Sequence, residues 1–403
     1  MIEKITLKDF LSYGEVTKPS PIYSSPPKVT TTLKMRPLNV LVGPNASGKS
    51  NFVEALALLR AAPKDLPLPI RNGGGVAEWI WRGDGKAPDR ATVEVTLASR
   101  KASAGHADPP PFRYRLTFGA PGGTFRVLDE LIDQDQRGRP PDPYFATQKD
   151  GPVIARGAKG SRVLEPVDID STQSILSQRK DPENFHTLTK VGEFFGKILI
   201  YRSWTFGPDA PIRSSCLIDV PTATLAEDFS NLPARLAVLK RNPATKRRLL
   251  ERLAELESEF TDLEVTPEGG RLQLYLIDGD RPVPASRLSD GTLRALALLA
   301  ILIEPGPASV VVIEEPALGL HPDMLPTIGE LLVSASEQAQ LVVTTHSSDL
   351  LDALTKHAES VVLCERQGAS TALRRLGRAD ITALAEFDGL GAMWMSGSLG
   401  VTP

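Results

Sequence analysis

A short stretch near the start of the chain combines glycine, small polar residues and one lysine at a spacing that suits phosphate binding. Residues 43–50 read Gly-Pro-Asn-Ala-Ser-Gly-Lys-Ser and match the pattern G-x-x-x-x-G-K-[ST]. Such small residues let backbone N–H groups wrap a β-phosphate, and the N-terminus of the following helix adds partial positive charge. Lys49 is expected to reach the β- and γ-phosphates, and the Ser50 hydroxyl to ligate Mg²⁺. The residues predicted to bind ATP here are Gly43, Pro44, Asn45, Ala46, Ser47, Gly48, Lys49, Ser50 and Asn51.

Two carboxylates follow an apolar run far downstream. Residues 310–316 read Val-Val-Val-Ile-Glu-Glu-Pro. A strand this apolar is buried on both faces, so charges at its tip lie at the sheet edge where ligands collect. Glu314 suits the Mg²⁺–water shell, and Glu315 suits the polarisation of an attacking water. A strand that simply ends in solvent is the alternative.

A histidine ends another apolar run, Leu341-Val-Val-Thr-Thr-His346. A lone histidine is more often structural than catalytic. Its position at a strand end, however, would bring the imidazole of His346 near the γ-phosphate if the strand neighbours the others. We therefore predict a catalytic role for His346 beside Glu315 and Lys49.

A fourth stretch places small and hydroxyl residues directly before a long apolar helix. Residues 287–294 read Arg-Leu-Ser-Asp-Gly-Thr-Leu-Arg. Taken alone, Ser289 or Asp290 could be an ordinary N-cap of that helix.

These motifs need an α/β scaffold to position them. Residues 38–42 predict a buried strand before the glycine loop, and the spacing of Phe52, Ala55, Leu56 and Leu59 predicts a helix after it. Strand and helix patterns also alternate from Thr292 to Leu363, which implies a parallel sheet with ligands at its C-terminal edge. The predicted helices span 292–303, 324–335 and 349–355, and the predicted strands 310–313, 341–345 and 361–363.

The middle of the chain has a different pattern. Residues 91–97, 112–118 and 123–128 alternate in polarity and predict an antiparallel sheet, and residues 135–165 have the composition of a mobile loop. Helical spacing dominates from Ser171 to Glu259, clearest in Leu249, Leu253, Leu256 and Phe260 after Pro243. We therefore expect three parts, namely residues 1–165 with the glycine loop and the antiparallel β subdomain, an inserted mostly helical lobe at 166–270, and a second half of the head at 271–403.

Composition limits the cellular compartments and the classes of partner that we expect for this chain. The 403 residues are 41% hydrophobic and carry a formal net charge of −3, so bulk charge does not attract nucleic acid or membranes. Only two cysteines are present, Cys216 and Cys364, and the apolar setting of Cys364 predicts a buried thiol in a reduced compartment. No apolar run reaches the roughly 18 residues of a membrane span, and the N-terminus lacks a signal-peptide pattern. We expect a cytoplasmic protein without a membrane partner.

The order of these motifs resembles that of ABC-type ATPases. Residues 43–50 match Walker A, 288–292 (Leu-Ser-Asp-Gly-Thr) the signature, 310–316 Walker B, 318–321 the D-loop and 345–347 (Thr-His-Ser) the switch histidine. More narrowly, the chain resembles the stand-alone AAA family ATPases of the RecF/SMC/OLD-like branch. Further similar stretches are Arg-Asn-Gly-Gly-Gly-Val-Ala-Glu-Trp-Ile-Trp at 71–81 and Leu-Gly-Ala-Met-Trp-Met-Ser-Gly-Ser-Leu-Gly at 390–400. The resemblance implies a P-loop ATPase head with a mixed central sheet, an N-terminal antiparallel β subdomain and an inserted helical lobe.

The resemblance also implies a homodimer held together by ATP. Ser289 and Gly291 of one protomer would close over the γ-phosphate bound by Lys49 and Ser50 of the other, and hydrolysis would open the dimer. Higher assembly is left open. The Mg²⁺-sensing glutamine of the family's Q-loop is assigned to Gln178 in preference to Gln173. Phe10 or Tyr13 could stack on adenine, although two aromatics in a short strand are more often core.

Several positions depart from the common family pattern. Asp290 and Thr292 replace the glycine and glutamine usual in transporters, which argues against the alternative that the chain is the nucleotide-binding subunit of a membrane transporter. Glu314 stands where the common pattern has Asp. His321 replaces the D-loop Asp, which puts crosstalk between two ATP sites in doubt. A further alternative is a scaffold that binds ATP without hydrolysing it and assembles with an effector nuclease.

DNA and a separate effector protein are the candidate macromolecular partners. The basic groups Lys240–Arg241 with Lys246–Arg248, and Arg156–Arg162, could contact phosphates, but both also suit solvated surfaces without interleaved aromatics. OLD-type nucleases carry a toprim domain after the ATPase. Since 57 residues (403 − 346) follow His346, we expect no such domain. The predicted setting is DNA repair or antiviral defence.

Overall fold

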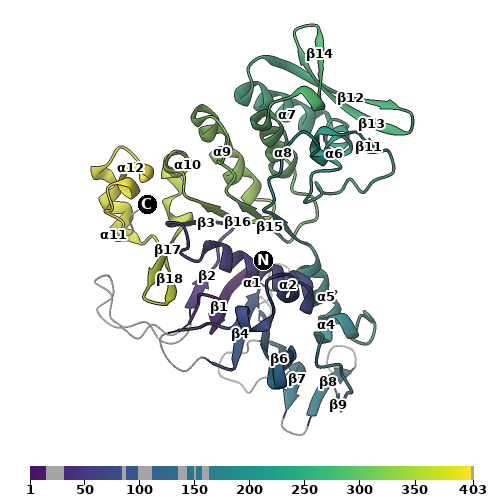
Figure 1. Ribbon diagram of the computed structural model, residues 1–403, viewed down its shortest axis with the longest axis vertical. Coiled ribbons are helices and arrows are strands. Elements are labelled where there is room, and N and C mark those ends of the chain that lie inside the picture. Colours follow the sequence, from purple (N-terminus) through teal and green to yellow (C-terminus); the bar gives the residue numbers. More distant parts are fainter. Residues whose placement is uncertain are drawn as a thin grey trace, which may run out of the picture. The chain divides into compact units, whose positions relative to one another are not determined.

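The computed structural model describes residues 1–14, 31–83, 88–98, 111–134, 143–148, 151–156 and 163–400. These residues form two compact units (Figure 1). The first unit comprises Met1–Arg36, Gly43–Ile198 and Val362–Arg375, and the second Pro37–Val42, Leu199–Val361 and Leu376–Pro403. The division of the chain at residues 165 and 270 remains a prediction.

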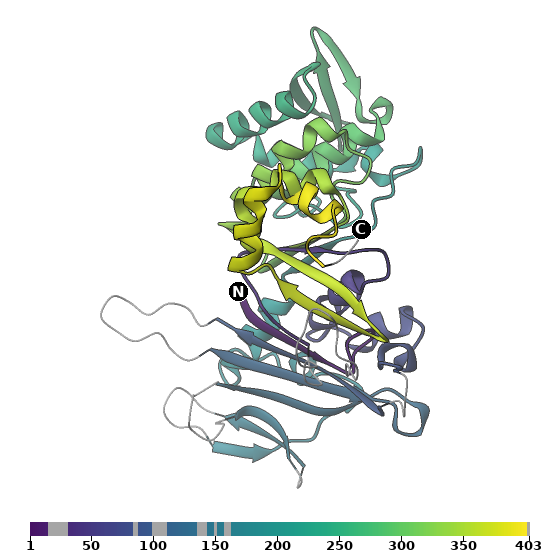
Figure 2. The same cartoon turned by 90° about the vertical axis from the view of Figure 1, so that its left-hand side faces the viewer.

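The first unit contains an antiparallel sheet in the order β2-β1-β4-β5-β6-β7-β8-β9, whose long strands are seen from another side in Figure 2. Its strands are β1 (Ile2–Lys8), β2 (Thr31–Lys34), β4 (Arg90–Leu97), β5 (Phe112–Gly119), β6 (Arg126–Gln134), β7 (Pro143–Gln148), β8 (Gly151–Arg156) and β9 (Val163–Pro166). The predicted strands 91–97 and 112–118 are confirmed as β4 and β5, whereas the strand predicted at 123–128 is misplaced, because β6 begins at Arg126 and continues to Gln134. The expected loop over 135–165 is wrong, because its described residues form β7, β8 and part of β9.

Alternation along β5 explains how this sheet forms. Tyr114, Leu116 and Phe118 are fully buried on one face. On the other face Arg115 forms an ion pair with Asp129 of β6, with 2.9 Å between Nε and Oδ2. A period of two residues thus puts apolar side chains on the core face and cross-strand charge pairs on the other.

The remaining elements in the described part of the first unit include five α-helices and a hairpin. The helices are α1 (Lys49–Ala61), α2 (Pro67–Asn72), α3 (Val76–Trp79), α4 (Ile175–Gln178) and α5 (His186–Gly196). The hairpin joins β17 (Val361–Gln367) to β18 (Ser370–Arg375), and β18 packs against β2. The predicted helix after the glycine loop is α1.

The second unit contains the parallel strands that end in the predicted site residues. Its strand order is β10-β15-β16-β3, with bounds β10 (Ile198–Tyr201), β15 (Val310–Glu314), β16 (Gln340–Thr345) and β3 (Leu38–Val42). Every residue of β3 and β16 is buried, as their apolar sequences predict. Register pairs Glu314 with Thr344 and Thr345 with Val42, so these strands end at one edge of the sheet.

Helices cover these strands. α9 (Leu325–Ser336) packs on β16 and β3, and α8 (Asp290–Leu302) and α10 (Ser348–Ala353) pack against α9. All three helices and the strands between them were predicted, with ends within two residues of those observed. Within the described ranges, every helix is too short or too polar to cross a bilayer.

A smaller antiparallel sheet completes the second unit. It contains β11 (Cys216–Leu217), β12 (Phe260–Glu268), β13 (Arg271–Asp278) and β14 (Arg281–Pro284), and α6 (Leu232–Leu239) and α7 (Pro243–Leu256) pack against it. Two short helices near the end of the chain, α11 (Arg378–Ala383) and α12 (Leu390–Met395), lie apart from this sheet, and α12 packs against α10 (Figure 1). The helical spacing that included Phe260 is wrong at its end, since α7 stops at Leu256 and Phe260 opens β12. Gly269 and Gly270 have φ of 54° and 77°, the left-handed pair that a two-residue turn between β12 and β13 requires.

Candidate functional site

The glycine-rich loop runs from the end of β3 into α1. Gly48 precedes α1 with φ 102°, and Ala46 has φ 62°, so the loop is curled back on itself. The ammonium group of Lys49 donates to the carbonyl oxygens of Gly43 at 2.6 Å and of Pro44 at 3.0 Å. Ser50, the next residue of α1, is exposed. The lysine thus lies against the first turn of its own loop, with the hydroxyl of the predicted metal ligand open to solvent.

Buried side chains of the first unit form hydrogen bonds to carbonyl groups of this loop. The Tyr13 hydroxyl donates to the Gly48 carbonyl at 2.8 Å, and Thr371 Oγ1 of β18 donates to the Ser47 carbonyl at 3.0 Å. A Cβ on Gly48 would lie 2.3 Å from Thr371 Oγ1, so glycine is required by space as well as by φ. Phe10 and Tyr13 are fully buried, which agrees with the core interpretation rather than with adenine stacking.

Cys364 lies beside the same loop. A Cβ on Gly43 would lie 2.2 Å from the Cys364 carbonyl oxygen, so the first glycine of the motif is also required by close approach. The thiol is free and buried, as predicted. Burial raises the pKa of Cys364 to about 12, while nearby Lys49 opposes the rise. The thiol therefore stays protonated at neutral pH and is not a nucleophile.

The structure brings Glu315 and His346 together in the second unit. Glu315 Oε2 lies 2.9 Å from His346 Nδ1 and accepts a hydrogen bond from the His346 amide at 3.3 Å. About a quarter of the Glu315 side chain (24%) and half of the His346 side chain (51%) are exposed, so both can reach a ligand. An exposed carboxylate with an imidazole on one of its oxygens has the geometry of a general base.

The backbone at this tip is unusual. Glu315 has φ 49°, in the left-handed region that non-glycine residues rarely adopt. Its amide donates to the Thr344 carbonyl of β16 at 3.0 Å, which holds the residue beside the neighbouring strand. Backbone strain of this kind clusters at functional sites. We call Glu314 and Glu315 with His346 the carboxylate tip.

Magnesium would need only part of its coordination shell from protein. In the described part of the chain, no cluster of three or more His, Cys, Asp or Glu side chains could hold a metal ion by itself. Mg²⁺ usually keeps several waters and binds one or two protein ligands together with substrate phosphates. The Ser50 hydroxyl in the first unit and the half-buried Glu314 carboxylate in the second are ligand types of this kind, and their binding of Mg²⁺ remains a prediction.

Ser289 occupies the N-cap of α8. Its hydroxyl oxygen accepts from the Thr292 amide at 3.0 Å, so the ordinary capping interpretation is correct as far as it goes. Ser289 is also exposed and Gly291 half-buried. A Cβ on Gly291 would lie 3.3 Å from the carbonyl oxygen of Gly319, which follows the exposed Leu318. The signature and residues 318–319 thus share one open surface of the second unit.

Both candidate Q-loop glutamines are bonded within the first unit. Gln178 Oε1 accepts from the Asp170 amide at 2.8 Å, and Nε2 donates to the Asp170 carbonyl at 3.0 Å. Gln173 accepts from the Leu66 amide and donates to Asp65 Oδ1, each at 3.2 Å. Metal binding by Gln178 remains a prediction that would require its amide to turn out of these bonds.

A buried carboxyl holds the turn that bears Gln178. Glu130 is fully buried on β6 and accepts from Tyr114 at 2.8 Å, from Ser174 at 2.5 Å and from the Ile175 amide at 2.8 Å. Burial raises the pKa of Glu130, although the hydrogen bonds from Ile175, Ser174 and Tyr114 oppose the rise. The start of α4 is thereby fastened to the antiparallel sheet.

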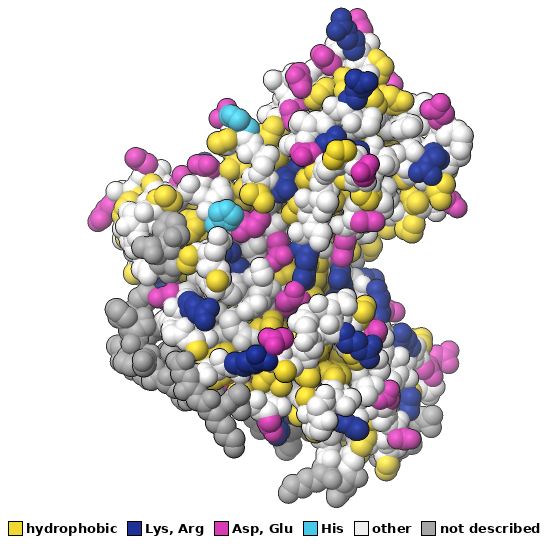
Figure 3. Space-filling view, viewed as in Figure 1, with side chains coloured by type: hydrophobic (Ala, Val, Ile, Leu, Met, Phe, Trp, Pro, Cys, Tyr) yellow, Lys and Arg dark blue, Asp and Glu magenta, His cyan; other side chains and the backbone are white. Residues whose placement is uncertain are grey.

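The basic groups considered for nucleic acid are partly engaged by protein. Lys240 Nζ pairs with Asp262 at 3.1 Å, Arg247 with Glu251 at 3.7 Å, and Arg248 bonds Ser334. On the face shown in Figure 3, basic side chains are interspersed with acidic ones. Of the group 156–162, only Arg156 falls within the described residues. DNA binding therefore remains a prediction.

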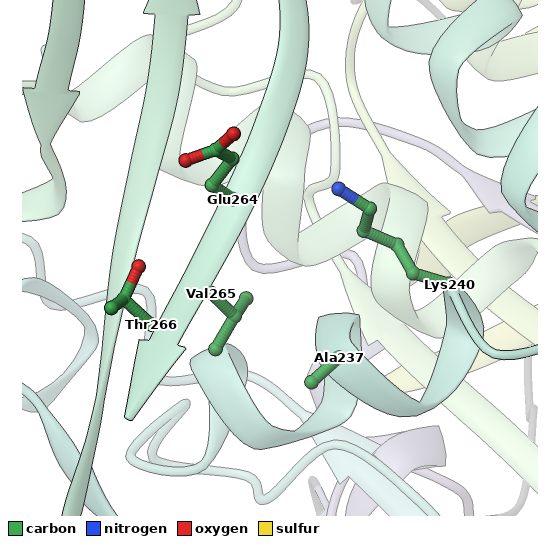
Figure 4. A pocket seen from close by; sticks show the side chains of 5 residues that line it. All are labelled: Ala237, Lys240, Glu264, Val265 and Thr266. Atoms are coloured by element: carbon green, nitrogen blue, oxygen red, sulfur yellow. The ribbon is translucent and has the colours of Figure 1, made fainter. Parts of the chain in front are cut away.

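An open pocket lies between α6 and β12 (Figure 4). It has a volume of about 290 Å³ and is lined by Ala237, Lys240, Glu264, Val265 and Thr266. Lys240 is its only cationic lining residue, and its ammonium group is bonded to Asp262 and to the Leu263 carbonyl. None of the lining residues belongs to a predicted site, and we assign this pocket no ligand.

Sequence reasoning missed the residues that brace the carboxylate tip. Trp204 Nε1 donates to the Glu314 carbonyl at 2.6 Å, and Arg294 Nη1 donates to the Glu315 carbonyl at 3.3 Å. One signal was available, because Arg294 is a cation in the otherwise apolar run 293–303. A charge there is expected to have a specific partner.

Comparisons with known proteins agree with this fold. A family model described as "AAA domain, putative AbiEii toxin, Type IV TA system" matches residues 38–352. A segment of 121 residues is 31% identical to Old nuclease of Escherichia phage P2, and covers 27% of this chain and 20% of that protein. The chain thus matches about a fifth of the length of this curated relative.

Two solved structures share the fold. A crystal structure of an SmcHead bound to the C-winged helix domain of ScpA is 14% identical with a TM-score of 0.57, over 94% of this chain and 99% of that one. An Smc head with an extended coiled coil bound to the C-terminal domain of ScpA, derived from Pyrococcus furiosus, is 13% identical with a TM-score of 0.55, over 96% and 98%. At these identities the likeness concerns the fold, which is that of a P-loop ABC-type ATPase head.

Proposed function

The chain belongs to the family described as "AAA domain, putative AbiEii toxin, Type IV TA system", within the RecF/SMC/OLD-like branch of ABC-type ATPases, and from this premise we propose that it hydrolyses ATP and dimerises around it. The observation that carries the proposal is the pair of Glu315 and His346, 2.9 Å apart. A carboxylate held this way at the end of β15 suits the activation of water.

The parallel register of the second unit supports the choice of nucleotide-binding residues. Val42 of β3 lies opposite Thr345 of β16 in the parallel register, Gly43 follows Val42, and His346 follows Thr345. The glycine loop and the carboxylate tip therefore both begin where neighbouring parallel strands end, which is where α/β proteins bind ligands.

The proposed chemistry follows from the residues. Backbone N–H groups of the loop and the ammonium group of Lys49 bind the phosphates. Glu315 accepts a proton from the attacking water. An imidazolium at His346 would donate from Nδ1 to Glu315 and from Nε2 to a phosphate oxygen. Mg²⁺, when bound through Ser50 and Glu314, would neutralise phosphate charge.

The exposed signature supports dimerisation. Ser289 and Gly291 lie on an open surface at the N-terminus of a 13-residue helix, and such a terminus favours an anion. We propose that this end meets the γ-phosphate of a second copy, which ADP lacks. ATP would then close the dimer, and hydrolysis would open it.

The decisive experiment is Glu315→Gln with saturating ATP and Mg²⁺. We expect phosphate release to fall at least about 100-fold while ATP stays bound, because the general base is lost. Light scattering should then show an ATP-dependent dimer. Glu337→Gln, at an exposed glutamate just after α9, is the matched control and should behave as the unmodified protein.

The outcomes separate this function from its alternatives. A monomeric Glu315→Gln variant at saturating ATP would contradict dimerisation. Unchanged phosphate release would contradict the role of Glu315. An unmodified protein that binds ATP without releasing phosphate would instead support a scaffold that assembles with an effector.

We propose DNA maintenance or antiviral defence as the setting, supported by the likeness to a phage Old nuclease and by the family description. Phosphate release should be measured with and without duplex and single-stranded DNA at two salt concentrations. Stimulation that weakens with salt would support binding to nucleic acid phosphates. The absence of stimulation at low salt would count against a DNA ligand.

A further inference from the structure

The carboxylate tip is tied to the signature end of α8 by side chains that no catalytic role yet explains. Trp204 and Phe206 follow β10, and the guanidinium of Arg294 on α8 lies over both rings, at 4.7 Å and 5.0 Å from their centroids. The same guanidinium reaches the Glu315 carbonyl, and the Trp204 indole reaches the Glu314 carbonyl. Two consecutive carbonyl groups of the tip are therefore held by one aromatic and cationic cluster.

A second arginine continues the connection. Arg213 donates to the carbonyl oxygens of Phe206 at 3.1 Å and of Leu288 at 2.6 Å, and also bonds the Asp290 carboxylate. Leu288 and Asp290 flank Ser289, the residue proposed to meet a second copy's nucleotide. A chain of direct contacts thus runs from the signature to the carbonyls beside Glu315.

We propose that Trp204, Phe206, Arg213 and Arg294 form a latch that positions Glu315 and links its position to the signature. The inference rests on the proposed function for its catalytic meaning. None of the four side chains is proposed to touch ATP. They are positioning residues that act through the backbone of the tip.

The tip needs such support because its backbone is strained. A non-glycine residue at φ 49° persists when its surroundings hold it. The Glu315 amide is bonded to β16, and the latch holds the carbonyl on each side of that amide. Loss of the latch would let Glu315 relax and would move its carboxylate away from His346.

The cluster is built to stay charged and in place. Arg294 is only 5% exposed, and burial lowers its pKa to about 10, so the guanidinium remains a cation at neutral pH. Cation–π contacts with the two rings compensate for the lost hydration. Phe229 stacks behind both rings, with centroids 5.1 Å from Trp204 and 6.0 Å from Phe206.

The latch offers a route for communication in the proposed dimer. Ser289 would act on the partner's nucleotide, whereas Glu315 acts on its own. Contact of the signature with the partner's nucleotide could therefore fix the position of Glu315 at the protomer's own nucleotide. This route does not require the D-loop, where His321 replaces the usual acid and instead caps the short turn Pro322–Met324.

The first test is hydrogen exchange in the nucleotide-free protein, which requires no turnover. The amides of Glu315 and Leu318 bond the Thr344 and Glu315 carbonyls. Trp204→Phe keeps a ring against Phe229 but removes the indole donor, and Arg294→Gln removes the cation. Both changes should speed exchange at these two amides at least about threefold. Arg252→Gln, an arginine paired with Glu255 and Glu330 on the same unit, is the matched control and should change neither amide.

The second test uses kinetics. We expect Trp204→Phe to lower kcat about tenfold, equivalent to about one hydrogen bond, with KM for ATP within about twofold. The Hill coefficient for ATP should also fall towards one, which a simple loss of stability would not produce. Melting temperatures identify variants that fail to fold, and Trp204→Phe decides the question if Arg294→Gln is one of them.

Unchanged exchange at Glu315 and Leu318 in a folded Trp204→Phe protein would overturn the latch, whether or not the protein hydrolyses ATP. An unmodified protein that releases no phosphate would overturn the proposed function instead. The exchange result would still decide whether the tip is held by these residues.

Discussion

The glycine loop and the carboxylate tip are supported in different ways. The loop lies in the first unit, and its carbonyls are bonded by Lys49, Tyr13 and Thr371. The tip lies in the second unit, and its carbonyls are bonded by Trp204 and Arg294. Hydroxyl groups of buried residues support the phosphate loop, whereas the Trp204 indole and an arginine that lies over two aromatic rings support the base.

This difference indicates which of the two regions, the glycine loop or the carboxylate tip, should respond to dimerisation. The loop has its lysine within its own motif and rests on fully buried Tyr13, so its shape does not depend on the signature. The tip shares its support with the end of α8, which is proposed to meet a second molecule. The shape of the glycine loop is therefore expected to be insensitive to dimerisation, and the position of the base to depend on it.

Lys49→Met changes the glycine loop and should give the largest effect, a loss of ATP affinity. Removing the ammonium group removes the charge that faces the phosphates. We expect ATP affinity to fall on the order of 100-fold, equivalent to about 2.7 kcal/mol, measured by calorimetric titration. Lys64→Met, at an exposed lysine beyond the end of α1, is the control. Equal affinity in the two variants would contradict the assignment of the loop.

Ser289→Asp separates the capping role from the proposed contact with a second copy. Aspartate caps helices about as well as serine, so the free energy of unfolding should change by less than about 0.5 kcal/mol. A negative charge facing the γ-phosphate should weaken the ATP dimer on the order of 100-fold, because like charges at an interface cost several kcal/mol. Light scattering in the Glu315→Gln background measures this. A dimer of normal affinity would show that Ser289 is only a cap.

The strands and motifs of the parallel sheet could be predicted because their signals are local. Residues 38–42, 310–314 and 340–345 are apolar enough to be recognised as buried strands, and each leads directly into residues whose types suit phosphate binding or catalysis. The neighbouring strand ends that bear Glu315 and His346 were also expected, but the direct contact between these two side chains was not predicted.

The supports could not be predicted, because they join segments far apart in the chain. Tyr13 and Thr371 meet the loop from opposite ends of the sequence, and Trp204 meets a carbonyl 110 residues away. No periodicity encodes such contacts. The prediction of a loop over 135–165 failed for another reason. The Gly, Pro and Asp content of this segment is typical of loops, and its short strands are defined by their pairing with one another.

Tyr13→Phe tests whether the hydrogen bond from Tyr13 to the Gly48 carbonyl contributes to the shape of the glycine loop. The change removes one of two donors to the buried Gly48 carbonyl, which still accepts from the Phe52 amide at 3.1 Å, so the loss should cost about 0.5–1.5 kcal/mol. We expect a lower free energy of unfolding by urea and a weaker affinity for ATP, with kcat retained at saturating ATP. Tyr275→Phe, at a half-buried tyrosine of β13, is the control. A fall in kcat alone would place the effect at the tip and not at the loop.

Asp290→Asn should give the smallest effect. It tests whether the connection from the signature to the carboxylate tip needs the Asp290 carboxylate. Asp290 pairs with Arg213, but its side chain is 63% exposed, and exposed ion pairs contribute about 0–1 kcal/mol. Arg213 keeps its bonds to the Leu288 and Phe206 carbonyls, so the connection to the signature should survive. We expect stability within about 1 kcal/mol and kcat within about twofold of the unmodified protein. A loss as large as that of Trp204→Phe would mean that the aspartate, rather than the backbone carbonyls beside it, transmits the position of the signature to Glu315.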